Sequence, residues 1–342
     1  MAYQRAASVL AAMMVLFASI PTGVQSTGVC YGVHGDGLPS AADVVQLYKS
    51  NGITAMRIYV PDVQTLLALN GTNIGVLMDV ADENVPRLAA SVSAASDWVK
   101  INIQRYLPGV SFRYIAVGNE ITGSATQSIV PAMKNLNAAL SAAGITGIKV
   151  STAVRMDVLS ASSPPSFGRF KDGYMKDVVA VINSTGAPLL LNVYPYFAYA
   201  GDTKNIDLDF ALFQPSSQVI RDDSFNYTNL FDAMVDAVYK GLMHANTDAP
   251  IVISESGWPS DGGVGASADN ARTYNQNLIN HVGKGTPYRS QPLETYVFSM
   301  FNENRKPGAE TEKHLSVAPR TTLSVAPRTK RFVCLPTCGT QT

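Results

Sequence analysis

The chain of 342 residues is 46% hydrophobic and only 15% charged, and its 26 basic residues balance its 26 acidic ones. This composition excludes a fibrous, low-complexity or fully disordered protein, and the balanced charge disfavours binding to nucleic acid. Residues 27–314 alone carry 21 basic and 26 acidic residues, whereas residues 315–342 are basic. A mildly acidic body suits an uncharged substrate.

The first 26 residues have the pattern of a secretory signal peptide. Arg5 precedes an apolar run over residues 6–20, and the small residues Val24 and Ser26 stand at positions −3 and −1 of a cleavage point before Thr27. The run is shorter than the roughly 20 apolar residues that a membrane-spanning helix needs. We therefore expect a secreted protein, extracellular or vacuolar, without a membrane anchor.

The glycosylation sequons agree with this route, whereas the cysteines bear on how the fold is held together. N-glycosylation sequons begin at Asn70, Asn183 and Asn226. The cysteines are Cys30, Cys334 and Cys338, so the body has no disulfide framework and must be held together by its core. Whether any of these cysteines pair is left open by the sequence.

Short apolar runs alternate with longer amphipathic segments along the body, as in repeated βα units. Five helices are predicted over residues 41–50, 96–106, 129–143, 230–244 and 268–281. Eight strands are predicted over residues 28–32, 55–59, 74–79, 114–118, 148–154, 189–193, 251–254 and 295–301. Eight such repeats in this length favour an α/β fold of the (β/α)8 TIM-barrel type over an open doubly wound sheet.

The helix predicted over residues 230–244 shows the expected amphipathic pattern. Leu230, Met234, Val238 and Leu242 recur every four residues and form an apolar stripe. Asp232, Asp236 and Lys240 occupy other positions. The pattern predicts a helix that packs its apolar stripe against the sheet.

The C-terminus carries a direct repeat, in which residues 315–321 and 323–329 both read Leu-Ser-Val-Ala-Pro-Arg-Thr. Two copies of a seven-residue unit cannot build a repeat architecture. The expected organisation is therefore a signal peptide over 1–26, a barrel domain over 27–314, and a disordered basic tail over 315–342.

Two glutamates follow predicted strands at positions where barrel enzymes place their reactive groups. Glu120 follows the fourth strand and Glu255 follows the seventh. Two carboxyl groups about 5 Å apart can cleave a glycosidic bond with retention, one as acid and one as nucleophile. The competing interpretation is that both are helix N-terminal carboxylates favoured by the helix dipole.

Other residues near these strand ends suit a carbohydrate ligand. Asn119 is a neutral donor for a sugar hydroxyl, and aromatic rings can stack on sugar faces. Packing is an equally good explanation for each candidate ring; the candidates are Tyr194, Tyr196, Phe197, Tyr199 and Trp258. The four histidines, at positions 34, 244, 281 and 314, are scattered, so we expect no metal site and no cofactor.

Several segments together are similar to the plant family 17 glycoside hydrolases, and closely resemble the endo-1,3-β-glucanases of grasses. They are Gly28-Val-Cys-Tyr-Gly32, Met56-Arg-Ile-Tyr59, Val117-Gly-Asn-Glu120, Asn192-Val-Tyr-Pro-Tyr-Phe197, Val252-Ile-Ser-Glu-Ser-Gly-Trp-Pro-Ser260 and Met300-Phe-Asn-Glu-Asn304. The resemblance covers residues 28 to about 314, in order and with family spacing.

The resemblance implies a (β/α)8 barrel that hydrolyses internal linkages of β-glucans with retention. It implies that Glu120 is the general acid/base and Glu255 the nucleophile, and that Tyr194 orients the nucleophile. Glu303, Lys306 and Glu312 match a supporting network of charges, while Tyr59 and Phe301 match cleft residues. The expected partner is β-glucan polysaccharide, bound by a monomer.

The chain departs from the family after His314, where the family continues with a Gly-Leu-Phe segment and an aromatic end. The missing segment predicts apolar barrel surface left uncovered. Three alternatives stay open: a 1,3;1,4-β-glucanase, a glucan-binding protein with impaired turnover, and a wall-tethering module that uses the basic tail.

Overall fold

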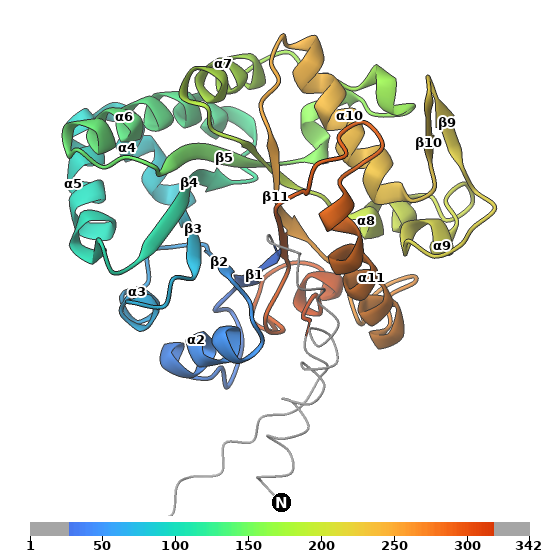
Figure 1. Cartoon of the computed structure of the whole chain (residues 1–342), viewed down its shortest axis with the longest axis horizontal. Coiled ribbons are helices and arrows are strands. Elements are labelled where there is room, and N and C mark those ends of the chain that lie inside the picture. The colour runs from blue at the N-terminus through green and yellow to red at the C-terminus, as the bar shows by residue number, and fades with distance from the viewer. Residues whose placement is uncertain (1–26, 318–342) are drawn as a thin grey trace, which may run out of the picture.

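The computed structural model describes residues 27–317 of the chain; the predicted signal peptide and residues 318–342 lie outside that range. Eight parallel strands close into a barrel, in the order β1-β12-β11-β8-β5-β4-β3-β2, and helices surround it (Figure 1). The strands are β1 (Thr27–Tyr31), β2 (Ala55–Ile58), β3 (Gly75–Val80), β4 (Ser111–Asn119), β5 (Lys149–Arg155), β8 (Leu189–Asn192), β11 (Ile251–Ser256) and β12 (Thr295–Val297). The predicted TIM barrel and all eight predicted strands are confirmed.

Ten helices accompany the strands within the described range. They are α2 (Ala41–Ser50), α3 (Val63–Leu69), α4 (Val85–Ala90), α5 (Val92–Asn102), α6 (Ile129–Ala142), α7 (Met175–Thr185), α8 (Pro195–Gly201), α9 (Leu208–Ala211), α10 (Leu230–His244) and α11 (Ala268–His281). Two small hairpins, β6 (Leu159–Ala161) with β7 (Arg169–Phe170) and β9 (Ile220–Asp222) with β10 (Phe225–Tyr227), are inserted between barrel strands. Each of these helices is too short or too polar to span a bilayer.

Helix starts follow from capping side chains in the sequence. Ser40 accepts a hydrogen bond from the backbone N–H of Asp43 at the start of α2, and Ser267 does the same for Asn270 in α11. Asn229 caps α10 through the N–H of Asp232. Because each cap satisfies an N–H that lacks a partner within the helix, these helices begin where the sequence predicts.

The predicted stripe of α10 is confirmed, but its polar residues are buried as well. Asp236 accepts a hydrogen bond from the backbone N–H of Tyr288, and the ammonium of Lys240 lies 4.3 Å from the centre of the Tyr288 ring. Asp232 pairs with His281 of α11 at 2.7 Å. The helix therefore packs on several sides, and the acids and the lysine serve contacts with neighbouring segments.

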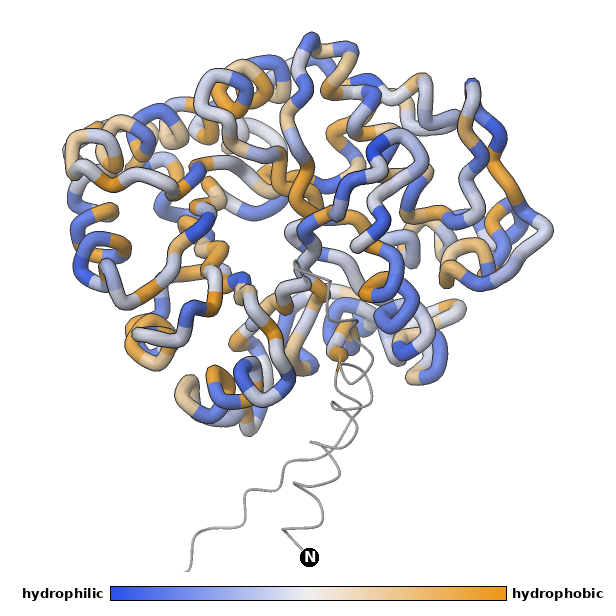
Figure 2. Tube along the Cα trace, in the orientation of Figure 1, coloured by the Kyte–Doolittle hydropathy of each residue, from blue (hydrophilic) through white to orange (hydrophobic). Residues whose placement is uncertain are grey.

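Two hydrophobic clusters form the core, and in Figure 2 hydrophobic positions recur along the strands and on the helices around them. The larger cluster lies mainly between strands and helices. The smaller one consists largely of inward-facing strand residues, among them Cys30, Ala55, Ala116, Ala153 and Tyr296. Small side chains alternate with large ones there, which lets the barrel interior fill completely.

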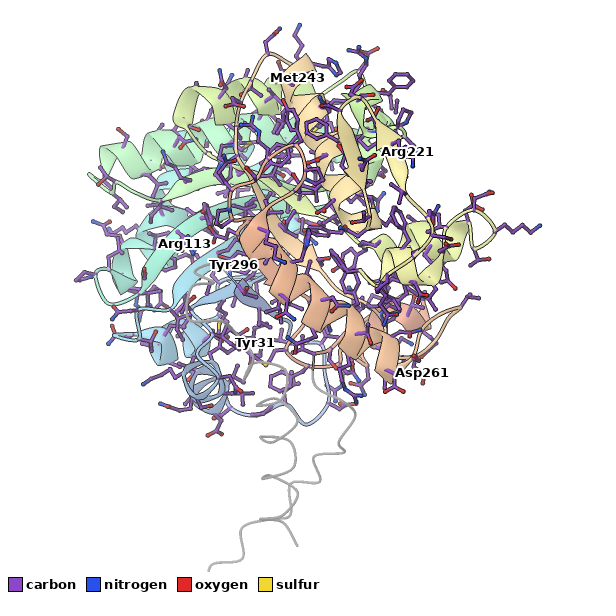
Figure 3. The ribbon with its side chains drawn as sticks, turned by 45° about the vertical axis from the view of Figure 1, so that its right-hand side comes forward. Tyr31, Arg113, Arg221, Met243, Asp261 and Tyr296 are labelled. Carbon is purple, nitrogen blue, oxygen red and sulfur yellow. The ribbon has the colours of Figure 1, made fainter. Side chains whose placement is uncertain are left out.

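The amino-terminal end of the barrel is closed by a polar cluster. The guanidinium of Arg113 pairs with Glu294 at 2.8 Å, and Glu294 also accepts hydrogen bonds from the hydroxyls of Tyr114 and Tyr296. Figure 3 labels Arg113 and Tyr296, which come from β4 and β12. These contacts stabilise the amino-terminal end of the barrel, whereas barrel proteins place their ligand sites at the opposite end.

The prediction that the tail begins at residue 315 is wrong for its first three residues. Leu315 and Val317 are buried, and the backbone of this segment pairs with Ser299 through hydrogen bonds of 2.7 and 2.8 Å. Leu315 joins the small barrel cluster beside Phe298. An apolar side chain at the start of the repeat thus covers part of the barrel surface that the sequence analysis expected to be exposed.

Leu315→Ala is expected to lower the free energy of unfolding by about 2–4 kcal/mol, because it leaves a cavity in the barrel cluster. Chemical denaturation measures this loss. The matched control is Leu67→Ala, at a leucine that is 58% exposed, where a change below about 0.5 kcal/mol is expected. Equal losses in the two variants would contradict the placement of Leu315 in the core.

Candidate active site

A cleft of about 760 Å3 lies at the carboxyl ends of the barrel strands. Its lining includes residues at or just after the end of every barrel strand, for example Gly32, Tyr59, Ala81, Glu120, Met156, Tyr194, Glu255 and Phe298. Side chains that are far apart in the sequence therefore meet in one cavity. This is the position in which barrel proteins build their reactive centres.

Glu120 is aimed into the cleft by an irregular strand end. The register of β4 against β5 shifts between Ala116 and Asn119, and Gly118 and Glu120 adopt left-handed φ angles of 75° and 57°. The left-handed φ of Gly118 would strain any other residue, whose Cβ would also lie 2.2 Å from Ile121 Cδ1 and push that side chain aside. Left-handed backbone at a glutamate is uncommon and costs free energy, and such residues cluster at functional sites.

The Glu120 carboxyl group is mostly desolvated. Burial raises its pKa and the nearby Glu255 raises it further, whereas a hydrogen bond from Asn192 and the charges of Arg155 and Arg57 oppose the shift. The amide of Asn192 donates to its Oε1 at 2.8 Å. This environment favours the protonated form of the carboxyl group at a higher pH than usual.

Glu255 is buried as well, but three donors converge on its carboxyl group. Arg57 and Tyr59 donate to Oε1 at 2.9 and 2.8 Å, and Tyr194 donates to Oε2 at 2.6 Å. Register shifts of β11 against both neighbouring strands lie at this residue. These three donors hold the Glu255 side chain in one orientation.

Arg57 is fully buried beneath both glutamates and connects the site. Besides Glu255, its guanidinium donates to Asp79 at 2.6 and 3.2 Å, to Asn119 Oδ1 at 2.8 Å and to Asn192 Oδ1 at 3.1 Å. Burial raises the pKa of Asp79 to about 6, although Arg57 opposes that shift. The cation thereby fixes side chains from four other strands.

The two asparagines continue this network toward Glu120. Asn192 donates to Asn119 Oδ1 and to Glu120 Oε1, and its own Oδ1 accepts from Ser254. The carbonyl oxygen of Asn119 is thus used within the protein. The side-chain nitrogen Nδ2 of Asn119 has no hydrogen-bond partner among the described residues and stays available to a ligand.

Glu303, Lys306 and Glu312 also line the cleft, as the sequence predicts for a charge network. Lys306 donates to Glu312 at 3.0 Å, and Glu303 accepts from the backbone N–H of His34 at 3.2 Å. Burial raises the pKa of Glu303, whereas the His34 N–H and Lys306 counteract it. Burial disfavours the charged form of Lys306, but Glu312, Glu255 and Glu303 together raise its pKa.

The predicted aromatic residues divide into two groups. Tyr59 and Tyr194 line the cleft and contact Glu255. Tyr196, Trp258 and Phe301 are not among the residues that line the described cavity. Trp258 is fully buried and its indole N–H donates to the carbonyl of Gly265, so it supports the site from behind and does not form a stacking surface for sugars.

Four residues of the site were not singled out from the sequence: Arg57, Asp79, Asn192 and Arg155. The available signal was a charge inside an otherwise apolar strand, at Arg57 in β2 and at Asp79 in β3. Phe197, one of the candidate rings, lines the cleft and is 42% exposed. No cluster of His, Cys, Asp and Glu residues within 27–317 has the arrangement of a metal site.

Comparisons with known proteins agree with this geometry. Residues 27–321 match the family described as glycosyl hydrolases family 17. The chain is 56% identical over 317 residues to glucan endo-1,3-beta-glucosidase GII of Hordeum vulgare, an alignment that covers 92% of this chain and 95% of the relative. It is 49% identical over 290 residues to lichenase-2 of Hordeum vulgare, with coverages of 84% and 93%.

Solved structures give the same result. A plant beta-glucan endohydrolase, one of two described as having distinct substrate specificities, has a TM-score of 0.82 at 48% identity and covers 84% of this chain and 95% of its own. The beta-1,3-glucanase and pollen allergen CJP38 of Cryptomeria japonica has a TM-score of 0.83 at 44% identity, with coverages of 86% and 98%. The match to the family model across the described barrel, with these identities, shows that the chain belongs to family 17 of the glycosyl hydrolases.

Proposed function

We propose that this protein is an endo-acting hydrolase that cleaves internal 1,3-β-glucosidic linkages of 1,3-β-glucans with retention of configuration. The observation that carries the proposal is the pair of glutamates in one cleft with different hydrogen-bond partners. Glu120 accepts a hydrogen bond from Asn192, and burial raises its pKa, whereas three donors converge on Glu255. The double-displacement reaction requires two carboxyl groups, one that donates a proton and one that attacks the anomeric carbon. The names of relatives, most of them glucan endo-1,3-beta-glucosidases, support the linkage and the endo action.

In the first step, the Glu255 carboxylate attacks the anomeric carbon while the Glu120 carboxyl group donates its proton to the departing glycosidic oxygen. The product is a glucosyl ester of Glu255 and a free sugar hydroxyl. In the second step, Glu120 takes a proton from water, and the hydroxide equivalent displaces Glu255. Tyr59, Tyr194 and Arg57 hold the nucleophile in one orientation through both steps.

Glu303, Lys306 and Glu312 act as the supporting charges of this centre. Lys306 lies among three acids, and its positive charge limits the repulsion that Glu303 and Glu312 impose on Glu255. Asn119 is placed to donate its amide to a sugar hydroxyl. The partner is β-glucan, bound by a monomer, and secretion to the cell wall or the vacuole is the proposed route.

A 1,3;1,4-β-glucanase is the second candidate function, because lichenase-2 of Hordeum vulgare is 49% identical over 290 residues. Purified protein incubated with linear 1,3-β-glucan and with mixed-linkage glucan separates the two. Mixed-length oligosaccharides from the first substrate support the proposal. Release from the mixed-linkage glucan alone would replace it with the second candidate, and no release from folded protein would leave only glucan binding.

Glu255→Gln is expected to lower kcat by at least about 10³-fold, because the neutral amide cannot form the glucosyl ester. The loss should be accompanied by retained binding of oligosaccharide in calorimetry. Glu120→Gln should lose comparable activity on glucan but still release, in a rapid burst, the leaving group of an activated aryl glucoside that needs no proton. The second step of that reaction should stay slow, because it needs Glu120 as the base. If both variants lose that burst equally, the assignment of Glu120 as the acid is wrong.

The pH dependence follows from the raised pKa of Glu120. Glu120 must be protonated to donate, so the activity falls as the pH rises through its pKa, and burial moves this alkaline limb above the range of an ordinary glutamate. A profile of kcat/KM on 1,3-β-glucan measures the limb. An alkaline limb near the pKa of a solvated carboxyl group, about 4.3, would contradict the proposed environment.

Tyr194→Phe removes one of the three donors to Glu255 without changing the shape of the ring. We expect kcat to fall by about 10-fold or more, since a charge-assisted hydrogen bond is lost, while the melting temperature stays close to that of the unchanged protein. Tyr274→Phe is the matched control, because that buried hydroxyl contacts Ser256 and no glutamate of the cleft. Equal losses of activity in both variants would argue against the orienting role of Tyr194.

A further inference from the structure

Arg155 is a charged residue of the cleft to which the reaction described above assigns no part. It is the last residue of β5, and residues 156–158 form the short helical turn η4 that follows. Its Nη2 donates to Asp157 at 2.6 Å, and its Nη1 lies 3.9 Å from Glu120 Oε2. Arg155 and Asp157 both line the cavity beside Glu120, and both side chains are 47% exposed.

We propose that Arg155 and Asp157 together set the pH at which Glu120 loses its proton, and so fix the upper pH limit of the enzyme. This inference rests on the proposed function, since it concerns the proton that Glu120 donates. Arg155 stabilises the ionised form of Glu120 by its charge. Asp157 weakens that effect, because it holds one arm of the guanidinium and partly neutralises it.

The charged and polar groups that face Glu120 come from several strands. Glu255 of β11 repels its ionised form, Arg57 of β2 attracts it, and Asn192 of β8 donates a hydrogen bond to it. From the loop after β3, Asp82 accepts from the backbone N–H of Asn119, the residue before Glu120. Tyr194 of the β8 loop also lies within electrostatic reach of Glu120.

Arg155 and Arg57 both favour the ionised form of Glu120, but they differ in burial and in their other contacts. Arg57 is buried and divided among Asp79, Glu255 and two asparagines, so changing it disturbs the whole site. Arg155 is half exposed, and its ion pairs are with Asp157 and Glu120, while Tyr174 also lies within electrostatic reach. A change there alters the charge near the acid while leaving the frame of the cleft in place.

The geometry lets Asp157 orient the guanidinium of Arg155 toward Glu120. A guanidinium has a planar fork, so a contact with Asp157 through Nη2 orients Nη1 toward Glu120. Arg155 holds the pKa of Asp157 below its ordinary value through that hydrogen bond, so Asp157 stays negative over the working range. The two charges therefore act on Glu120 with opposite signs.

The test is the alkaline limb of kcat/KM on 1,3-β-glucan at low salt. Arg155→Gln should move the limb to higher pH by about half a pH unit, and Asp157→Asn should move it to lower pH. Arg155→Lys keeps the charge and should leave the limb close to that of the unchanged protein. Because both side chains are exposed, 1 M salt should shrink the shifts.

The decisive result is that the alkaline limb moves in opposite directions in Arg155→Gln and Asp157→Asn. A merely structural ion pair would shift the limb in the same direction whichever partner is removed. Arg272→Gln and Asp269→Asn make the same changes in an exposed ion pair of α11, and neither should move the limb. An unmoved limb with a raised KM in Arg155→Gln would overturn the proposal in favour of a contact with the sugar. An unchanged protein that does not hydrolyse the glucan would instead refute the proposed function itself.

Discussion

The buried guanidinium of Arg57 is the constraint on which the site depends. A cation with no exposure to water is costly unless its donors are all used, and here they are shared among Asp79, Glu255 and two asparagine oxygens. Removing a partner would leave a charge uncompensated, at a cost of about 3–5 kcal/mol. The barrel thus has a charged frame near its carboxyl end, where the strands would otherwise be packed only by apolar side chains.

The position of Arg57 accounts for the different hydrogen-bond partners of the two glutamates. Glu255 accepts hydrogen bonds directly from Arg57 and from two tyrosine hydroxyls. Glu120 is connected to Arg57 by hydrogen bonds only through the side-chain amide of Asn192. Burial is the main cause of the raised pKa of Glu120. Identical side chains thus have different partners, because only one of them accepts a hydrogen bond from the cation.

The segment after β12 shows how a barrel can use an unusual end. Leu315 and Val317 are buried, and their backbone pairs with Ser299, although they belong to the first copy of the repeat in the basic C-terminal segment. Glu312 lies just before them and reaches Lys306. Covering the barrel surface and positioning the last acid of the cleft therefore depend on the same few residues.

The sequence by itself determined the eight strands, most of the long helices and the strand-end positions of Glu120 and Glu255, because apolar runs, helix caps and residue order are local properties. Only the tertiary structure decided what surrounds each side chain. It buried Trp258, which the sequence offered as a sugar-stacking ring, and it brought Arg57, Asp79, Asn192 and Arg155 to the glutamates from separate strands. Burial and proton affinity depend on neighbours that the chain closure supplies, so no local pattern encodes them.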